Sequence, residues 1–193
     1  MLKYTEEFID GDYFRAYMYA SLKEQLEEIN PSGTGVEYGG SNSVIQSMMP
    51  NVHFSSPRNY PQYDVCKPWP NDQYWDVSVT DQVLEHVLDP VAAINNMGAH
   101  SNMTVLTVPF FMYVHNCPVD CWRMTPYMVE TLLRNAGFNH VDVRSWGNIT
   151  AAQWCVETGG GRPPAGITRD MLFENIEWND PKVPFVIWAI GRK

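Results

Sequence analysis

Strand-like and helix-like segments alternate along this chain, and their order limits the folds that it can adopt. Apolar patterns typical of strands occupy residues 35–38, 51–55, 75–80, 103–108, 141–145 and 183–190. Helical spacing or helix-start signals occupy residues 12–29, 43–49, 82–87, 89–97 and 126–136. This alternation predicts an α/β fold with a doubly wound, mostly parallel sheet, helices on both faces and an antiparallel last strand. Such sheets bind ligands at the carboxyl ends of their strands.

The length of 193 residues fits one domain with a sizeable core and is too short for two ordinary ones. We therefore expect a single domain over residues 1–193, in which residues 1–33 form an N-terminal helical cap. Residues 149–182 form an insertion between the last two strands that is too long for a hairpin loop. This insertion is either a substrate-facing excursion or a small packing appendix.

Charge and apolar content exclude several classes of function. The formal net charge is −9, so the surface repels phosphate backbones overall, and we expect no nucleic-acid partner. No apolar run approaches the roughly 20 residues of a membrane span. The N-terminal sequence MLKYTEEFIDGD is too acidic and polar for a secretory signal. These features predict a cytoplasmic protein without a membrane span and leave homo-oligomerisation open.

The four cysteines are widely spaced except for one C-x3-C pair, and no export signal accompanies them, so we expect free thiols. They are Cys66, Cys117, Cys121 and Cys155. Together with His115 and Asp120, the C-x3-C pair has some likeness to a zinc cluster. A second pair of ligands is missing, and we expect no metal there.

The sequence GVEYGGSNS, residues 35–43, follows the first predicted strand. A glycine turn between a strand and a helix lets the backbone approach a ligand closely. An acidic residue at the strand end can hold an ammonium group or a ribose hydroxyl. Glu37 with Gly39 and Gly40 meets both needs. The alternative is a tight turn that binds nothing.

Further motifs support the ligand-binding interpretation. YDVCKPWP, WDVSVTDQVLEHVLDP and LTVPF follow one another over residues 63–110. In this order they resemble the class I S-adenosylmethionine-dependent methyltransferases, and most closely the methyltransferase type 11 group. The resemblance covers roughly residues 36–143, with VLEHV.DP as its most specific part. It implies a seven-stranded fold, S-adenosylmethionine as cofactor and methyl transfer to a small-molecule or glycan-linked acceptor.

The resemblance also implies how the glycine loop binds the cofactor. Glu37 would lie near the methionine amino group, with Gly39 and Gly40 forming the turn beneath the cofactor. The loop departs from the family at Ser41 and Ser43, where glycine is frequent. A serine hydroxyl can still donate to a carboxylate or accept from a ribose hydroxyl, so we include Ser41 in the cofactor site.

Two further pairs of residues receive cofactor roles from the resemblance. Asp64 and Val65 would lie beside the adenine, with the carboxylate accepting from its exocyclic amine. Asp81 and Gln82 would line the methionine side. The second strand runs into HFSSPRNY, which lacks the acidic residue that usually binds the ribose.

The segment PFFMYVHNCPVDCWRMTP, residues 109–126, resembles a PF…H..P.D..R.TP motif in a subset of the family. Some members of this subset accompany surface-glycan synthesis. The resemblance places His115, Asp120 and Arg123 near the acceptor. A hydroxyl acceptor must lose its proton, so we expect His115 as general base, with His86 as the second candidate. Asp120 would orient an imidazole or pair with Arg123; the alternative is a purely structural ion pair.

Three functional hypotheses follow. The first is an active methyltransferase, and the second is an inactive binding or assembly module, which the serines of the loop and the missing ribose carboxylate favour. The third is a metal-dependent hydrolase that uses His86, His115 and Asp120. In relatives that methylate quinone precursors, E..EH binds a divalent metal. Because Gln82 replaces the first carboxylate before Glu85 and His86, we expect no metal site there.

Overall fold

The computed structural model describes residues 2–9, 12–39, 44–70, 73–116, 118–160 and 162–193. These residues form one six-stranded mixed sheet in the order β2-β1-β3-β4-β6-β5. The strands are β1 (Ser32–Tyr38), β2 (Asn51–Phe54), β3 (Trp75–Asp81), β4 (Ser101–Pro109), β5 (His140–Trp146) and β6 (Val186–Arg192). β1 to β4 pair in parallel, whereas β6 is antiparallel to both of its neighbours, β4 and β5. The expected α/β fold and the antiparallel last strand are confirmed.

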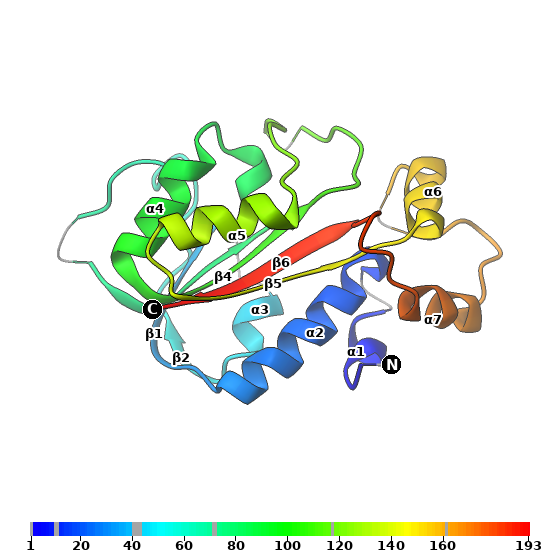
Figure 1. Cartoon of the computed structure of the whole chain (residues 1–193), viewed down its shortest axis with the longest axis horizontal. Helices are drawn as coiled ribbons and strands as arrows, with labels where there is room; N and C mark the ends of the chain where they lie inside the picture. Colours follow the sequence, from blue (N-terminus) through cyan, green and yellow to red (C-terminus); the bar gives the residue numbers. More distant parts are fainter. Residues whose placement is uncertain (1, 10–11, 40–43, 71–72, 117, 161) are drawn as a thin grey trace.

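Helices lie on both faces of the sheet (Figure 1). α4 and α5 pack on one face, and α2 with the short α3 packs on the other. α6 and α7 lie beyond the end of the sheet where β5 ends and β6 begins. The helices are α1 (Thr5–Phe8), α2 (Tyr13–Ile29), α3 (Val44–Ser47), α4 (Pro90–His100), α5 (Pro126–Asn135), α6 (Ile149–Thr158) and α7 (Arg169–Glu177), with a 3-10 turn η1 (Leu84–His86).

Two buried clusters, one on each face, form the core. Successive strand side chains point to opposite faces, so one strand contributes to both clusters. In β4, Met103 and Val105 belong to the cluster beneath α2, whereas Leu106 and Val108 belong to the cluster beneath α4 and α5. Burial on both faces explains the continuous apolar run of this strand.

The starts of α4 and α5 follow the capping signals in the sequence. The Asp89 carboxylate accepts the Ala92 N–H at 2.9 Å, and the Thr125 hydroxyl accepts the Met128 N–H at 3.2 Å. A proline follows each cap at the first helical position, where its missing N–H costs nothing. Both predicted helix starts are confirmed.

The expectation of seven strands is wrong for the described residues, which form six. Only six segments of the sequence carry a strand pattern, and the seventh strand was implied by the family resemblance. The described part of residues 55–74, between β2 and β3, forms an isolated bridge between Tyr38 and Arg58 but no strand. This stretch holds Pro57, Pro61, Pro68 and Pro70, and proline cannot donate to a sheet ladder.

The helix expected over residues 82–87 is also wrong, because only the short turn η1 forms there. Gln82 has a φ of 55°, which is incompatible with a right-handed helix, and Asp89 caps a new helix soon afterwards. The backbone between them therefore turns sharply across the end of β3.

The insertion is more regular than its sequence suggested, since it forms α6 and α7. The side chains of Asn148 and Thr168 cap these helices. The Trp146 indole donates to the Ile176 carbonyl at 2.8 Å, and the Asn148 amide donates to the Trp178 carbonyl at 2.8 Å. These bonds anchor the insertion to the end of β5, so at least this part of it is a packing element.

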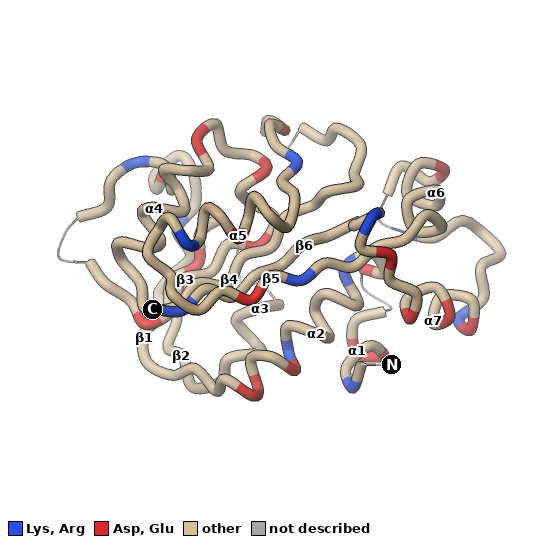
Figure 2. The backbone as a smooth tube through the Cα atoms, viewed as in Figure 1, with Lys and Arg blue, Asp and Glu red and all other residues tan. Residues whose placement is uncertain are grey.

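Charged residues of both signs are interspersed along the backbone (Figure 2). Within the part of the chain that the structure describes, no helix is both long enough and apolar enough to span a bilayer.

Candidate functional site

The carboxyl ends of β1, β3 and β4 meet at one end of the sheet, and Asp81 lies at the centre of this end. One carboxylate oxygen of Asp81 accepts from the Thr107 hydroxyl at 2.5 Å. The other accepts from the Tyr19 hydroxyl of α2 at 2.9 Å. Asp81 is therefore held from two sides, by the neighbouring strand and by the helix that covers the sheet.

Gln82 continues from Asp81 in a strained conformation. Its φ of 55° is uncommon for a residue other than glycine and costs about 1 to 3 kcal/mol. Thr107 fixes this conformation, since its hydroxyl oxygen accepts from the Gln82 backbone N–H at 3.1 Å and from the side-chain amide at 2.9 Å. Strain of this kind, held in place by neighbours, is concentrated at functional sites.

Gln82 opens onto a cavity of about 240 Å³ beside the ends of β3 and β4. The insertion reaches this cavity through Gly160. The residues that line the cavity are Asp12, Phe14, Arg15, Gln82, Pro109, Met112, Tyr113, His115, Gly160, Phe185 and Val186.

Asp12 and Arg15 bring both signs of charge to the cavity from the start of α2. The Arg15 Nε lies 3.2 Å from an Asp12 carboxylate oxygen. Neither residue was predicted as a site residue from the sequence, because residues 1–33 were expected only to form a helical cap. One signal could have found Arg15: a charged residue among the aromatic side chains of Tyr13, Phe14 and Tyr17.

The structure places the predicted glycine loop only in part. Glu37 is fully buried in β1, and its carboxylate accepts from the Gln46 amide of α3. Gly39 has a φ of 79°, and a Cβ there would lie 2.5 Å from Val83 Cγ2. Gly40 and Ser41 lie outside the described residues. The positive φ and the close Val83 side chain both favour glycine at position 39.

Asp64 and Val65 lie in the loop between β2 and β3. The Asp64 carboxylate accepts the Cys66 N–H at 3.0 Å and keeps a partly exposed side chain. Val65 is buried among the core residues beneath α4 and α5, and the Asn96 amide of α4 donates to its carbonyl at 2.7 Å. Neither residue lines the 240 Å³ cavity.

The loop after β4 brings His115, Asp120 and Arg123 together. The Arg123 guanidinium binds both Asp120 oxygens, at 2.5 and 2.7 Å. The His115 backbone N–H donates to Asp120 at 2.8 Å, and its ring Nδ1 lies 3.2 Å from the same oxygen. Arg123 above all, and the N–H of His115, hold the pKa of the Asp120 carboxyl well below its usual range. The predicted grouping of these three residues is therefore present.

Glu85 and His86 on η1 face the same loop. The His86 Nδ1 lies 2.5 Å from the Val119 carbonyl oxygen, and the two histidine rings, His86 and His115, meet edge to face with centroids 5.0 Å apart. Glu85 is 1% exposed, and burial raises its pKa to about 7. Among the described residues, neither oxygen of the Glu85 carboxylate has a hydrogen-bond partner.

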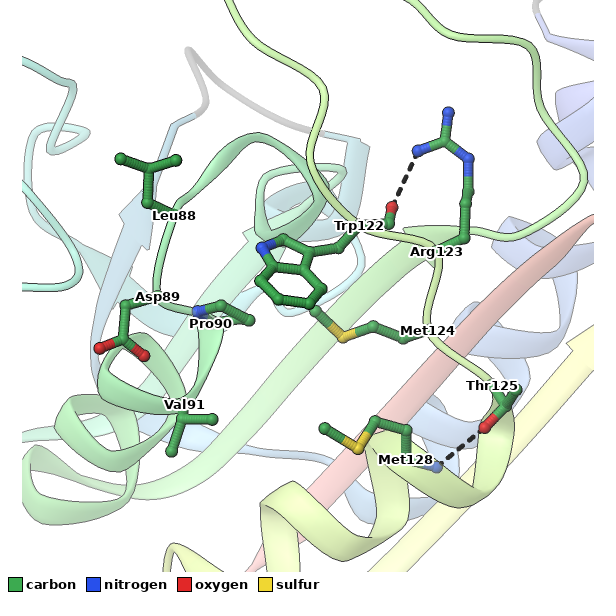
Figure 3. Close-up of a pocket in the computed structure, with 9 residues that line it drawn as sticks. All are labelled: Leu88, Asp89, Pro90, Val91, Trp122, Arg123, Met124, Thr125 and Met128. Carbon is green, nitrogen blue, oxygen red and sulfur yellow. Dashed lines mark hydrogen bonds between the residues drawn. The ribbon is translucent and has the colours of Figure 1, made fainter.

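A second, more apolar cavity of about 430 Å³ lies between the start of α4 and the start of α5 (Figure 3). The Trp122 indole lies across it, and Leu88 at its rim is 82% exposed. The loop after β4 thus contributes to both cavities, with His115 in the smaller and Trp122 in the larger.

Comparisons with known proteins give matches at the level of structure. No protein-family model matches the sequence, and no curated protein matches it either. An S-adenosylmethionine-dependent methyltransferase from Mesorhizobium loti is 14% identical with a TM-score of 0.57, over 92% of this chain and 98% of that one. The N-terminal domain of EvdMO1 with SAH bound is 13% identical with a TM-score of 0.53, over 92% of this chain and 84% of that one.

A second structure of the EvdMO1 domain, in the presence of SAH and D-fucose, is 14% identical with a TM-score of 0.52, over 90% of this chain and 82% of that one. At such low identity these likenesses define the fold alone. The chain has the Rossmann-like α/β fold of S-adenosylmethionine-dependent methyltransferases.

Proposed function

We propose that this protein is an S-adenosylmethionine-dependent methyltransferase that acts on a small-molecule or glycan-linked acceptor. The observation that carries the proposal is the strained Asp81–Gln82 turn, which is fixed by Thr107 and opens onto a cavity at the carboxyl ends of the parallel strands. Ligands of doubly wound sheets bind at this position. Membership of the type 11 group and action in the cytoplasm remain predictions from the sequence.

The residues around the cavity fit the methionine end of the cofactor, which carries an ammonium and a carboxylate group. Arg15 can pair with the carboxylate and Asp12 with the ammonium. Gln82 offers a side-chain carbonyl, because its amide nitrogen is used by Thr107. We further propose that Asp64 accepts from the adenine amine and that Gly39 lets the backbone pass beneath the cofactor.

The bound cofactor supplies an electrophilic methyl group on its sulfonium, and the protein has to align the acceptor and remove its proton. We assign proton removal to His115. Its Nδ1 is turned toward Asp120 and the Tyr113 carbonyl oxygen, so its Nε2 is available as the base. Asp120 keeps the ring in this orientation, and Arg123 holds Asp120 in turn. His86 is the second candidate for the same role.

The proposed role of His115 as a base also indicates the class of acceptor. A positioned imidazole accelerates methyl transfer to a hydroxyl, which must lose a proton, far more than transfer to an acceptor without such a proton. We therefore assign the acceptor to the hydroxyl class. A sugar hydroxyl agrees with the resemblance of residues 109–126 to enzymes that accompany glycan synthesis. The presence of D-fucose with the EvdMO1 domain is a parallel in a protein of the same fold.

Calorimetric titration of the purified protein with S-adenosylmethionine, and separately with S-adenosylhomocysteine, tests the proposal. We expect both to bind with micromolar dissociation constants, equivalent to about −8 kcal/mol. Absence of binding to either ligand, with circular dichroism showing a folded protein, would contradict an active methyltransferase and favour the inactive binding module.

Replacing Asp64 with alanine is expected to weaken S-adenosylmethionine binding by about tenfold, the equivalent of one hydrogen bond to the adenine. The same titration measures the effect. Asp64→Asn is the conservative comparison: its amide oxygen can still accept both the Cys66 N–H and the adenine amine, so it should bind nearly like the parent. Affinity in Asp64→Ala equal to that of the parent would show that the adenine assignment is wrong.

Replacing Gly39 with alanine is expected to weaken cofactor binding and to destabilise the protein by about 1 to 2 kcal/mol. The new Cβ contacts the Val83 side chain, and residue 39 has a left-handed conformation that is unfavourable for any residue with a Cβ. Gly166→Ala is the control, since Gly166 also has a positive φ, of 89°, but has nothing within 4 Å of a built Cβ. If both variants bind the cofactor like the parent, Gly39 has only a local backbone role.

A further inference from the structure

Three side chains that can ligate a metal converge from two separate segments. Glu85 and His86 come from η1, after β3, and His115 comes from the loop after β4. One ligand atom of each residue lies within 4.8 Å of the ligand atoms of the other two. The convergence depends on the fold, because about 30 residues separate the two segments in the sequence.

The hydrogen bonds of the two histidines leave one nitrogen of each ring free for a ligand. The His86 Nδ1 lies 2.5 Å from the Val119 carbonyl oxygen, which can only accept, so Nδ1 carries the proton. The His115 Nδ1 lies 3.2 Å from the Tyr113 carbonyl oxygen and 3.2 Å from an Asp120 oxygen. In both rings Nε2 therefore keeps its lone pair. Metal-binding histidines are typically oriented in this way by a carbonyl or carboxylate.

Glu85 supplies a buried carboxylate that lacks a partner. Both of its oxygens are without hydrogen bonds among the described residues, and one lies 3.6 Å from the His86 Nε2. Two groups that both present lone pairs would repel each other unless a proton or a cation lay between them. The positive charges of Arg15 and Arg123 act on Glu85 from a distance, but among the described residues neither guanidinium donates a hydrogen bond to its carboxylate.

We propose that Glu85, His86 and His115 bind one divalent transition-metal ion of the zinc type. Two imidazoles and one carboxylate suit Zn²⁺, Co²⁺ or Fe²⁺ better than Mg²⁺ or Ca²⁺, which prefer oxygen ligands. Gln82 replaces the carboxylate that precedes Glu85 in E..EH, which predicted no metal site. In the structure, the Gln82 amide binds Thr107, and His115 takes the third position.

Three protein ligands leave an open coordination position, as in catalytic zinc sites. His115 also lines the 240 Å³ cavity, so this position would be close to the proposed acceptor. In that role the metal would bind the acceptor oxygen, and His115 would act as a ligand instead of as a base. This role depends on the proposed function, whereas metal binding itself does not.

Titration of the full-length protein with Co²⁺ after removal of metals by a chelator tests the site. We expect one Co²⁺ per chain, with visible d–d absorption, no thiolate charge-transfer band, and displacement by Zn²⁺. His86→Gln, His115→Gln and Glu85→Gln should each weaken binding by at least about 100-fold, beyond the 10- to 100-fold typical of residues that only support a ligand.

His140→Gln and Cys121→Ser are the matched controls, because both residues are exposed and neither belongs to the cluster. Both should bind Co²⁺ like the parent. The proposal is overturned if the folded parent takes up no stoichiometric metal, or if the two ligand variants His86→Gln and His115→Gln retain full affinity.

Calorimetry with S-adenosylmethionine on the same preparations separates the two proposals. Cofactor binding without metal uptake would overturn the metal site and leave the methyltransferase standing. Metal uptake without cofactor binding would support the site and count against the methyltransferase.

Discussion

Replacing His115 with alanine is expected to lower the rate of methyl transfer by about 100- to 10,000-fold, the usual range for losing a positioned general base. The affinity for S-adenosylmethionine should stay close to that of the parent. The reason is that none of the proposed cofactor contacts comes from the His115 ring: Arg15 and Gln82, which line the same cavity, are assigned to the methionine end, and Asp64 is assigned to the adenine.

The measurement requires an acceptor. Small hydroxyl compounds and free sugars, D-fucose among them, can be screened for S-adenosylhomocysteine formation, and the best acceptor is then used for kcat and KM of parent and variant. His53→Ala, at an exposed position of β2, serves as the control for loss of an imidazole. Equal losses in turnover and in cofactor affinity would indicate that His115 has a structural role.

The same variant also distinguishes the two chemical roles of His115. If it is the base, a chelator should leave the parent's activity unchanged, and only His115→Ala should be slow. If it is a metal ligand, the chelated parent should be as slow as the variant, and Zn²⁺ should restore the parent but not His115→Ala.

The helices and strands of this fold could be predicted from the sequence where the local capping and turn residues agree with the apolar pattern. Thr125 and Pro126 mark the start of α5 because a hydroxyl cap and a proline are both local features. β4 could be predicted because its long run of apolar, β-branched residues is typical of a buried strand. The helix predicted over residues 82–87 failed since Gln82 takes a left-handed conformation that its bonds to Thr107 stabilise, and no local pattern reports such a contact.

In the candidate site, residues within sequence motifs could be predicted, whereas residues brought there by tertiary packing could not. Asp81, Gln82 and His115 could be found because a family motif surrounds each of them. Arg15 could not, since its position beside the cavity depends on how α2 packs across the sheet and brings Tyr19 to Asp81. The convergence of Glu85 and His86 with His115 likewise depends on the chain crossing from the end of β3 to the end of β4.

Replacing Trp188 with alanine is expected to lower the free energy of unfolding by about 3 to 5 kcal/mol, the range for truncating a large buried aromatic side chain. Trp188 is 1% exposed in β6, between β4 and β5, and its indole packs near the Tyr17 ring. The indole N–H also donates to the side-chain amide oxygen of Gln25, on α2, at 2.9 Å. The variant therefore loses apolar burial and leaves a buried acceptor unpaired.

Urea unfolding followed by circular dichroism measures this loss without relying on tryptophan fluorescence. Trp178→Ala is the matched control, because that indole is 46% exposed and its removal should cost less than about 0.5 kcal/mol. A loss below about 1 kcal/mol for Trp188→Ala would mean that α2 does not depend on β6 for its position. Since α2 also supplies Arg15 and the Tyr19 bond to Asp81, a loss of the α2–β6 contact in Trp188→Ala should also weaken cofactor binding.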